Sequence, residues 1–164
     1  MKQLQLAILS TPLLLVGASA LAATTTDTFQ VSATVLDACS VTAGDLAFGN
    51  VDMLSGTDVD ATSSIEVTCS TGTAYDVGIG PGTADGATTS SRQMGDGGTG
   101  ALDYALYSDG TRDTNWGDVV DTDTVAGTGD GGVQTLTVFG RVPSGQTGVA
   151  AGAYTDTVTV TVTY

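Results

Sequence analysis

The sequence contains no histidine and very few cations. Its 164 residues include 18 acidic and four basic side chains, and the formal net charge is −14. The four cations are Lys2, Arg92, Arg112 and Arg141. A surface of this charge repels nucleic-acid phosphates and anionic lipid headgroups, so we exclude nucleic-acid binding. The acidity fits solubility first, and adaptation to a salty medium second.

The missing side chains also argue against catalysis. A nucleophilic serine, threonine or cysteine needs a neighbouring base, and histidine is absent while the single lysine is Lys2. Paired carboxylates could hydrolyse glycosides, but aspartates in Gly/Thr-rich stretches are far more often solvated turn residues. The acidic stretch 118–132 lacks both the EF-hand spacing and the nonapeptide calcium repeat. We expect no enzyme activity, no metal site and no cofactor.

Long apolar runs are absent as well. The longest, from about Leu4 to Val16, is shorter than the ~20 residues that span a bilayer, so we expect no membrane insertion. Lys2 precedes this run, and the small-x-small motif Ala20-Leu21-Ala22 follows it. We predict a secretory signal peptide, residues 1–22, removed after Ala22. The alternative is a buried N-terminal strand or helix. The remainder is long enough for one domain.

The sequence has two cysteines, Cys39 and Cys69. In an exported protein disulfides persist, and two cysteines allow one intramolecular bond. That bond would close a loop of roughly 30 residues and contribute ~3–4 kcal/mol in the chain-entropy picture. The alternative, a zinc site, would require four ligands. We therefore predict a Cys39–Cys69 disulfide.

Segments in which apolar and polar side chains alternate with a period of two are frequent, whereas no segment shows the helical period of 3.6. The clearest case is the C-terminal YTDTVTVTVTY, in which threonines alternate with a second set of side chains. Successive side chains of a strand point to opposite faces, so this segment is predicted to be a strand with one apolar face. That face carries Val158, Val160, Val162 and Tyr164.

Several shorter runs alternate in the same way, and Gly/Asp/Ser/Thr-rich stretches separate them. We predict strands at 64–69, 75–79, 102–106 and 136–138, a short one at 46–51, and loops at 80–100 and 108–132. Short strands with turn signals between them are typical of a β-sandwich or barrel. The predicted fold class is all-β.

Both ends of the mature chain carry an amphipathic strand pattern. Near the N-terminus the apolar positions are Phe29, Val31, Ala33 and Val35. Neither end has a charge, proline or bulge on its apolar face, which are the usual blocks against pairing of strand edges. We interpret both as edges that pair with another chain. The alternative is that residues 27–36 form an ordinary first strand of their own domain, and the two interpretations can be combined.

A series of motifs along the chain resembles a known family, the spore coat U domain, which is the pilin domain of archaic chaperone–usher pili. The motifs are CSV at 39–41, LAFGNV at 46–51, IEVTCSTGTAYDVGIGPG at 65–82, RQM at 92–94, LDYALYSDGTRDTNWGD at 102–118, TVFGRVPSGQ at 137–146 and the terminal GAYTDTVTVTVTY. Their order and spacing are specific, although each motif alone is weak. Residues 119–132 carry little of the pattern.

The resemblance implies an incomplete immunoglobulin-like β-sandwich of six strands, whose seventh is supplied in trans by donor-strand complementation. It further implies a periplasmic chaperone that lends a strand, and an outer-membrane usher at which the next copy's extension replaces it. The protein would then be a homopolymeric pilus subunit, exported through the periplasm to the cell surface, that supports adhesion and biofilm formation.

Specific residues take roles on this interpretation. Residues 23–36 would be the donor-strand extension, with Phe29, Val31, Ala33 and Val35 as its donor side chains, and residues 37–164 would be the pilin domain. The acceptor groove would be lined partly by Val158, Val160 and Val162. The carboxylate of Tyr164 would be held by basic chaperone residues, or Tyr164 would only be the last side chain facing the core.

Two other functions fit the same residues. One is a coat or matrix protein of the same family, laid down on a cell or spore, and the other is a monomeric carbohydrate-binding β-sandwich. For the three arginines we expect pairing with neighbouring aspartates, with a contact between subunits as the alternative. Trp116 is expected to pack as a loop anchor rather than to form a ligand platform at the surface.

Overall fold

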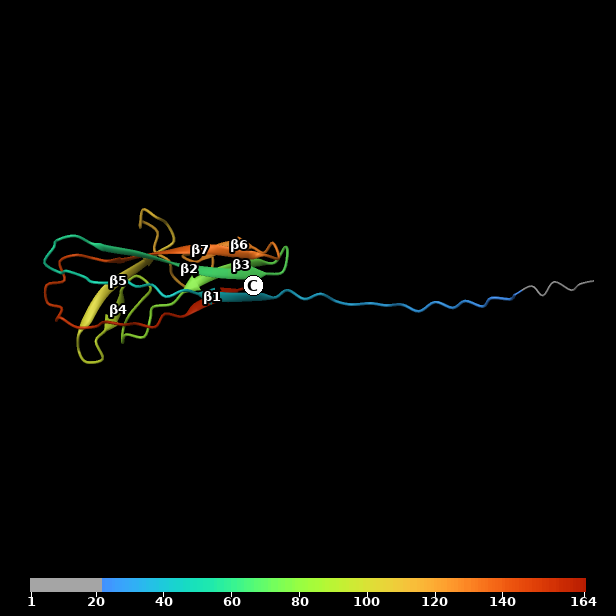
Figure 1. Ribbon diagram of the computed structural model, residues 1–164, viewed down its shortest axis with the longest axis horizontal. Helices are drawn as coiled ribbons and strands as arrows, with labels where there is room; N and C mark the ends of the chain where they lie inside the picture. Colours follow the sequence, from blue (N-terminus) through green and yellow to red (C-terminus); the bar gives the residue numbers. More distant parts are fainter. Residues whose placement is uncertain (1–21) are drawn as a thin grey trace, which may run out of the picture. The chain divides into compact units, whose positions relative to one another are not determined.

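The computed structural model describes residues 22–164, so the predicted signal peptide lies outside the described residues except for Ala22. The chain divides after Thr34 into two units, and the described strands belong to the second, Val35–Tyr164 (Figure 1). They are β1 (Cys39–Ala43), β2 (Val59–Cys69), β3 (Ala74–Ile79), β4 (Arg92–Gly95), β5 (Ala101–Tyr107), β6 (Val125–Thr128), β7 (Val133–Val142) and β8 (Val160–Thr163). From residue 22 onward we find no helix with the length and apolar character needed to cross a membrane.

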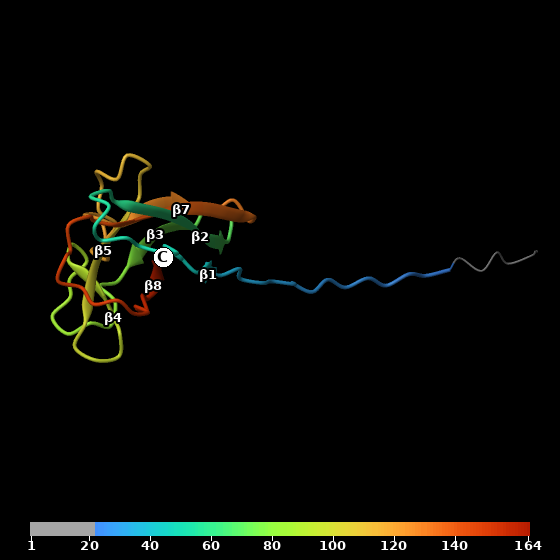
Figure 2. The same ribbon diagram turned by 60° about the vertical axis from the view of Figure 1, so that its left-hand side comes forward.

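The strands of the second unit form two antiparallel sheets. One sheet has five strands in the order β1-β2-β7-β5-β4, and the other has three in the order β6-β3-β8. β8 is therefore an edge strand that pairs with β3 on one side, with Val162 opposite Val77. β1 and β4 are the edge strands of the larger sheet. The C-terminus lies beside β1 in both views (Figures 1 and 2).

The core lies between the sheets and consists of the alternating apolar positions predicted from the sequence. Its buried side chains are Ile65, Val67 and Cys69 of β2, Tyr75, Val77 and Ile79 of β3, Leu102, Tyr104 and Leu106 of β5, Val138 and Val142 of β7, and Trp116. Each large apolar side chain fully buried in this way contributes ~1.5–3 kcal/mol. The predicted strands at 64–69, 75–79, 102–106 and 136–138 are thus confirmed.

Trp116 is one of the anchors of this core. Its side chain is 1% exposed, and its indole Nε1–H donates a 2.8 Å hydrogen bond to the carbonyl oxygen of Val77. Burial of a large aromatic with its single polar group satisfied stabilises the loop that carries it. The packing interpretation of Trp116 is confirmed.

Two of the predicted loops contain short strands, and β1 lies outside all the predicted strands and loops, so residues 22–164 contain eight strands where the resemblance implied six. The stretch 80–100 includes β4, which pairs with β5, and the stretch 108–132 includes β6, which pairs with β3. Both strands are four residues long, and β6 reads Val-Ala-Gly-Thr. Such segments are too short and too poor in apolar residues to show a period of two. They are strands because a longer neighbour supplies hydrogen bonds.

Two predicted strands are in part wrong. Residues 46–51 belong to no strand, and of the C-terminal segment only Val160–Thr163 does. Gly49 has a φ of +68°, which interrupts an extended chain within the first segment. Alternation nevertheless persists, since Leu46 and Phe48 are half-buried between exposed neighbours. Outside Val160–Thr163, both segments keep a strand-like pattern of burial although they belong to no strand.

The arginines divide into two kinds. Arg141 makes a bidentate pair with Asp60, at 2.7 and 2.9 Å, and Arg112 lies 3.3 Å from the same carboxylate. Aspartate pairing is therefore confirmed for these two. For Arg92 it is wrong: this side chain is 0% exposed, and its guanidinium donates to four backbone carbonyls at 2.6–2.8 Å. The carbonyls belong to Ile79, Gly80, Thr89 and Trp116.

Candidate functional site

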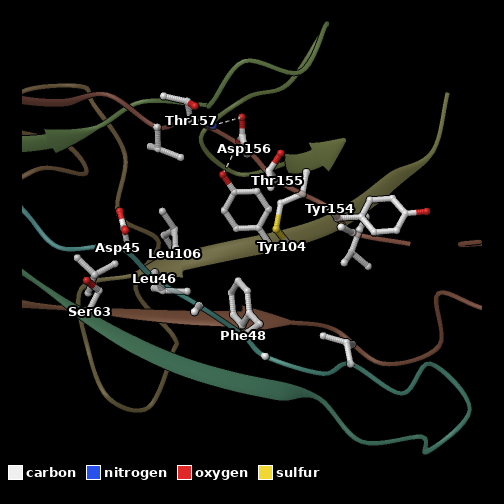
Figure 3. Close-up of a pocket in the computed structure, with 18 of the residues that line it drawn as sticks. Asp45, Leu46, Phe48, Ser63, Tyr104, Leu106, Tyr154, Thr155, Asp156 and Thr157 are labelled. Carbon is white, nitrogen blue, oxygen red and sulfur yellow. Dashed lines mark hydrogen bonds between the residues drawn. The ribbon is translucent and has the colours of Figure 1, made fainter. Parts of the chain in front are cut away.

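A groove with a volume of about 1160 Å³ opens between the two sheets of the second unit. Two segments flank it, which we call the first wall (residues 44–53) and the second wall (residues 149–158). Between them lies a largely apolar floor contributed by both sheets (Figure 3). The floor includes Ile65, Ile79, Met94, Leu102, Tyr104, Leu106 and Val138.

Aromatic side chains from a wall and from the floor meet inside this groove. Phe48 of the first wall and Tyr104 of β5 pack edge to face, with ring centroids 6.4 Å apart, and Figure 3 shows the Phe48 ring directed at Tyr104. Leu46 stands beside Phe48, and a Cβ at Gly140 would come within 3.0 Å of both. The glycine in β7 therefore lets the first wall approach the larger sheet closely.

Neither wall belongs to a sheet, although both are bounded by regular structure. The first follows directly from β1, where the amide of Gly44 donates to the carbonyl of Ser64. The second is tied at Thr155, which exchanges two 2.9 Å backbone hydrogen bonds with Gly95, and it leads into β8. Residues 156–158 between these points are in no strand. Backbone amides and carbonyls in such segments need water or another strand as partners.

One polar cluster interrupts the apolar lining at the second wall. The carboxylate of Asp156 accepts a 2.6 Å hydrogen bond from the phenol of Tyr104. It also accepts 2.8 Å bonds from the amide and the hydroxyl of Thr83, and one from the amide of Thr157. Figure 3 shows the Asp156 and Tyr104 side chains directed at one another. The second wall is therefore held by the Asp156 side chain in addition to the backbone pair at Thr155.

The electrostatics of this cluster follow from burial and hydrogen bonding. Burial acts to raise the pKa of Asp156, but the bonds from Tyr104 and Thr83 outweigh it and hold the pKa below its usual value. For Tyr104, burial and then the bond to the Asp156 carboxylate raise the pKa of the phenol. At neutral pH the pair is thus an ionised carboxylate and a protonated phenol that donates to it.

Only two of the four predicted acceptor residues line the groove. Val158 and Val160 line the groove, whereas Val162 packs against the core and is not part of the lining. Tyr164 is 61% exposed and also lies outside the lining. Sequence reasoning missed Leu46, Phe48, Tyr104, Tyr154 and Asp156 as lining residues. The alternation in LAFGNV and TDTVTV was the available signal for the walls, but it does not indicate that they face one cavity.

The predicted donor side chains are in the N-terminal segment, residues 22–38, which forms no strand. Phe29 is 87% exposed, Val31 81% and Val35 91%, and Ala33 is exposed as well. These are large apolar surfaces left in water, which a soluble chain ordinarily covers. The two cysteines, in contrast, are used: a disulfide joins Cys39 to Cys69, which lie opposite one another in the β1–β2 ladder.

The groove, its unpaired walls and the fold that surrounds them agree with the comparison to protein families. The model of the family described as Spore Coat Protein U domain matches residues 25–161. The chain belongs to this family. No curated protein matches the chain. The match covers the two walls and the predicted donor side chains along with the sandwich.

Solved structures similar to this spore coat U domain include pilus subunits and a chaperone–subunit complex. One is a chain of the CsuC–CsuE chaperone–tip adhesion subunit pre-assembly complex from the archaic chaperone–usher Csu pili of Acinetobacter baumannii. It is 25% identical, with a TM-score of 0.58, and the match covers 80% of this chain. The match spans 40% of the length of that other chain.

Two further structures share the fold at lower identity. The P pilus rod subunit PapA is 18% identical with a TM-score of 0.53, and 77% of this chain and 98% of that chain are covered. A chaperone–usher pilus studied for rod uncoiling contains a chain 14% identical, with a TM-score of 0.53 and coverage of 89% and 99%. The fold is therefore the immunoglobulin-like sandwich of pilins, as the sequence predicted.

Proposed function

We propose that this protein is a structural subunit of a surface pilus, assembled by the chaperone–usher pathway through donor-strand exchange. The observation that carries the proposal is a groove flanked by two segments that alternate like strands but belong to no sheet. A strand laid between such segments gains backbone hydrogen bonds from the walls and buries its apolar face on the floor.

The N-terminal extension, residues 23–36, has the properties of that strand. Its apolar side chains recur at every second position and are exposed, whereas the groove floor is apolar. Residues 29–35, which carry the donor side chains, span about 23 Å when extended, as do residues 154–160 along the groove. Each donor side chain that becomes fully buried would contribute ~1.5–3 kcal/mol.

The geometry of the second unit favours one direction of insertion. The chain enters this unit where Asp37 accepts a 2.8 Å bond from the hydroxyl of Thr73, next to the β2–β3 turn. β8 ends at the same pole, because Thr163 pairs with Asp76. A neighbour inserted parallel to β8 would place its own body at this pole, where the acceptor's extension begins. Antiparallel insertion places it near Tyr154, at the other end of the groove.

Antiparallel insertion gives each copy a receiving pole and an extending pole. Such a head-to-tail interface generates an open filament unless the rotation between copies closes a ring. Neighbouring copies of the chain are thus the partners in the fibre. A periplasmic chaperone and an outer-membrane usher are the proposed assembly partners, with the fibre on the cell surface, where it would serve adhesion and biofilm formation. No enzymatic role is proposed.

This function assigns a task to each part of the chain. Residues 1–22 are the signal peptide, residues 23–36 the donor-strand extension, and residues 37–164 the acceptor domain. In that domain Val158 and Val160 contribute to the groove. Val162 stabilises β8 against the core, and Tyr164 remains exposed for the chaperone.

A shortened chain tests the proposal. Residues 37–164 should remain monomeric, while residues 23–164 should form linear polymers. A peptide of residues 26–36 at 100 times its Kd should raise the melting temperature of the shortened chain by roughly 10 °C. A peptide of the same composition, with its apolar residues moved to both faces, is the matched control and should have no effect.

Other results would overturn the proposal. A shortened chain that is stable and ignores both peptides would behave as a monomeric binding module. Amorphous aggregates of the longer chain in negative-stain images, in place of thin fibres, would favour a coat protein.

A further inference from the structure

Both methionines of the part of the chain that the structure describes line the groove. Met53 is the last residue of the first wall, and Met94 of β4 belongs to the floor. The sequence has one further methionine, Met1, which is in the predicted signal peptide. The thioethers of residues 23–164 are thus gathered on the surface that receives a neighbour's strand on the proposed function, on which this inference rests.

The two thioethers are accessible to small solutes while the groove is empty. Both side chains pack against the buried core but are only half-buried themselves. Met94 precedes Gly95, whose backbone pairs with Thr155, so it lies beside the second wall. A strand inserted between the walls would cover the floor and exclude water from it. The accessibility of these sulfurs therefore depends on whether the groove is filled.

A thioether is a group that mild two-electron oxidants attack. Hydrogen peroxide transfers one oxygen to the sulfur: an S–O bond forms while the O–O bond breaks, and the second oxygen takes the proton of the first and leaves as water. The sulfur loses two electrons and the peroxide gains them. Cysteine thiols do not compete, because Cys39 and Cys69 form the disulfide and no cysteine of residues 22–164 is free.

Oxidation would change what the groove floor can bury. Methionine is a flexible apolar side chain that adapts to an irregular apolar surface, whereas its sulfoxide is polar. The sulfoxide oxygen needs a hydrogen-bond donor, which the floor side chains Ile79, Leu102 and Leu106 cannot provide. Water provides it in an empty groove, and an inserted strand would remove that water. Oxidation therefore disfavours the filled groove relative to the empty one.

We propose that Met53 and Met94 are modification sites for peroxide-class oxidants, which disable an empty groove and from which an inserted strand shields a filled one. A free subunit with sulfoxide in its groove no longer accepts a neighbour's strand. A subunit within the fibre keeps its thioethers reduced, because the inserted strand covers them. The same two side chains make assembly sensitive to oxidants and the finished fibre resistant to them.

Peroxide treatment of residues 23–164 tests the shielding. Monomer and polymer are separated by size exclusion and treated alike, and the gain of one oxygen at each methionine is followed by peptide mass spectrometry. Met53 and Met94 should be oxidised at least about fivefold more slowly in the polymer, because susceptibility follows exposure. Val119→Met, in an exposed loop outside the groove lining, is the matched control and should be oxidised equally in both. Equal rates at the two groove methionines in monomer and polymer would overturn the inference.

Polymer formation by the oxidised monomer tests the loss of strand acceptance. With an unchanged circular dichroism spectrum, this monomer should form polymer at least about tenfold more slowly, since a buried sulfoxide loses its hydrogen bonds to water. Methionine sulfoxide reductase should restore the rate. A chain with both Met53→Leu and Met94→Leu should polymerise at one rate with and without peroxide, whatever that rate is. Should this variant form no polymer, the recovery with the reductase still decides.

Two results would contradict the proposed effect of oxidation. One is an oxidised monomer that polymerises as fast as the untreated one, and the other is a monomer that loses its circular dichroism spectrum, because oxidation would then act on the fold rather than on the groove. A natural chain that forms no polymer before treatment would instead count against the proposed function.

Discussion

At the scale of single residues, Arg92 shows how a charge is accommodated in this sandwich. Burial lowers the pKa of its guanidinium, yet all the bonds that hold it go to backbone carbonyls of the β3 end, the following loop and the Trp116 segment. Arginine alone offers five donors in a rigid planar array. Arg92 therefore replaces a strand-to-strand ladder at the place where three chain segments meet.

Arg92→Met should lower the free energy of unfolding by at least ~3 kcal/mol, because buried carbonyls lose their donor. Arg92→Lys should cost less, since an ammonium still provides three donors. Urea denaturation measures both. The matched control is the exposed pair: Arg141→Gln should cost no more than ~1 kcal/mol. Equal losses at Arg92 and Arg141 would contradict the role given to Arg92.

The ion pair at the surface predicts a dependence on pH. The hydrogen bond from Arg141 lowers the pKa of Asp60 below its usual value. Its folded-state pKa is thus below the unfolded-state value of about 3.9. The stabilisation is then complete above that value and is lost as the pH falls through the folded-state pKa. Unfolding by urea between pH 6 and pH 2.5 should show a flatter acid limb for Asp60→Asn than for the natural chain. Parallel curves would contradict this assignment.

At the scale of elements, β1 depends on the disulfide more than on packing. Four of its five residues are exposed, and it is an edge strand that pairs with β2 alone in its sheet. Few buried apolar contacts therefore oppose its detachment. The disulfide at its first residue fastens the end of β1 that the N-terminal segment joins, and the first wall follows from the other end.

Cys39→Ala combined with Cys69→Ala should lower stability by ~3–4 kcal/mol and speed amide exchange across β1. Thermal melting and hydrogen exchange measure the two effects. β7 serves as the internal control, because it pairs with both β2 and β5. Uniform acceleration in β1 and β7 would show that the disulfide acts on the whole domain and not on β1.

The walls show what the sequence could predict about this fold and what it could not. The alternation at 46–51 and 154–164 predicted a strand in each segment, but only Val160–Thr163 forms one. A strand also needs a neighbour, which is not a local property. The same reasoning explains why β4 and β6 could not be predicted from the sequence. Each is a strand because it pairs with a longer neighbour, β4 with β5 and β6 with β3. Arg92 could not be distinguished from Arg141 because burial depends on residues distant in sequence.

Binding of residues 26–36 as a peptide should therefore convert both walls to strand. Amide exchange should slow by at least about tenfold at some positions of residues 45–51 and 156–158, as expected for new ladder hydrogen bonds. Hydrogen exchange with mass detection, compared with and without peptide, measures this. Slowing at the walls with none in the exposed loop at 119–122 is the predicted pattern. Unchanged exchange at both walls would contradict strand insertion.

At the scale of the whole molecule, the described residues include an exposed segment with alternating apolar side chains, residues 29–35, and an edge strand, β8, that pairs with β3 alone in its sheet. The exposed donor face and the apolar groove complement each other in pattern, length and polarity. On the proposed function, the groove receives a strand at one pole and the extension leaves at the other, so a solution of copies should form linear polymers. The strongly negative charge of every copy slows random encounters, so specific insertion is the association that remains favourable.

Mixing two defective copies tests the central claim most directly. One copy keeps the extension but carries Val158→Asp in its groove, and the other keeps the groove but lacks residues 23–36. Light scattering after size exclusion should find each copy monomeric alone and a 1:1 complex in the mixture. Two copies that stay separate when mixed would contradict strand exchange between neighbours.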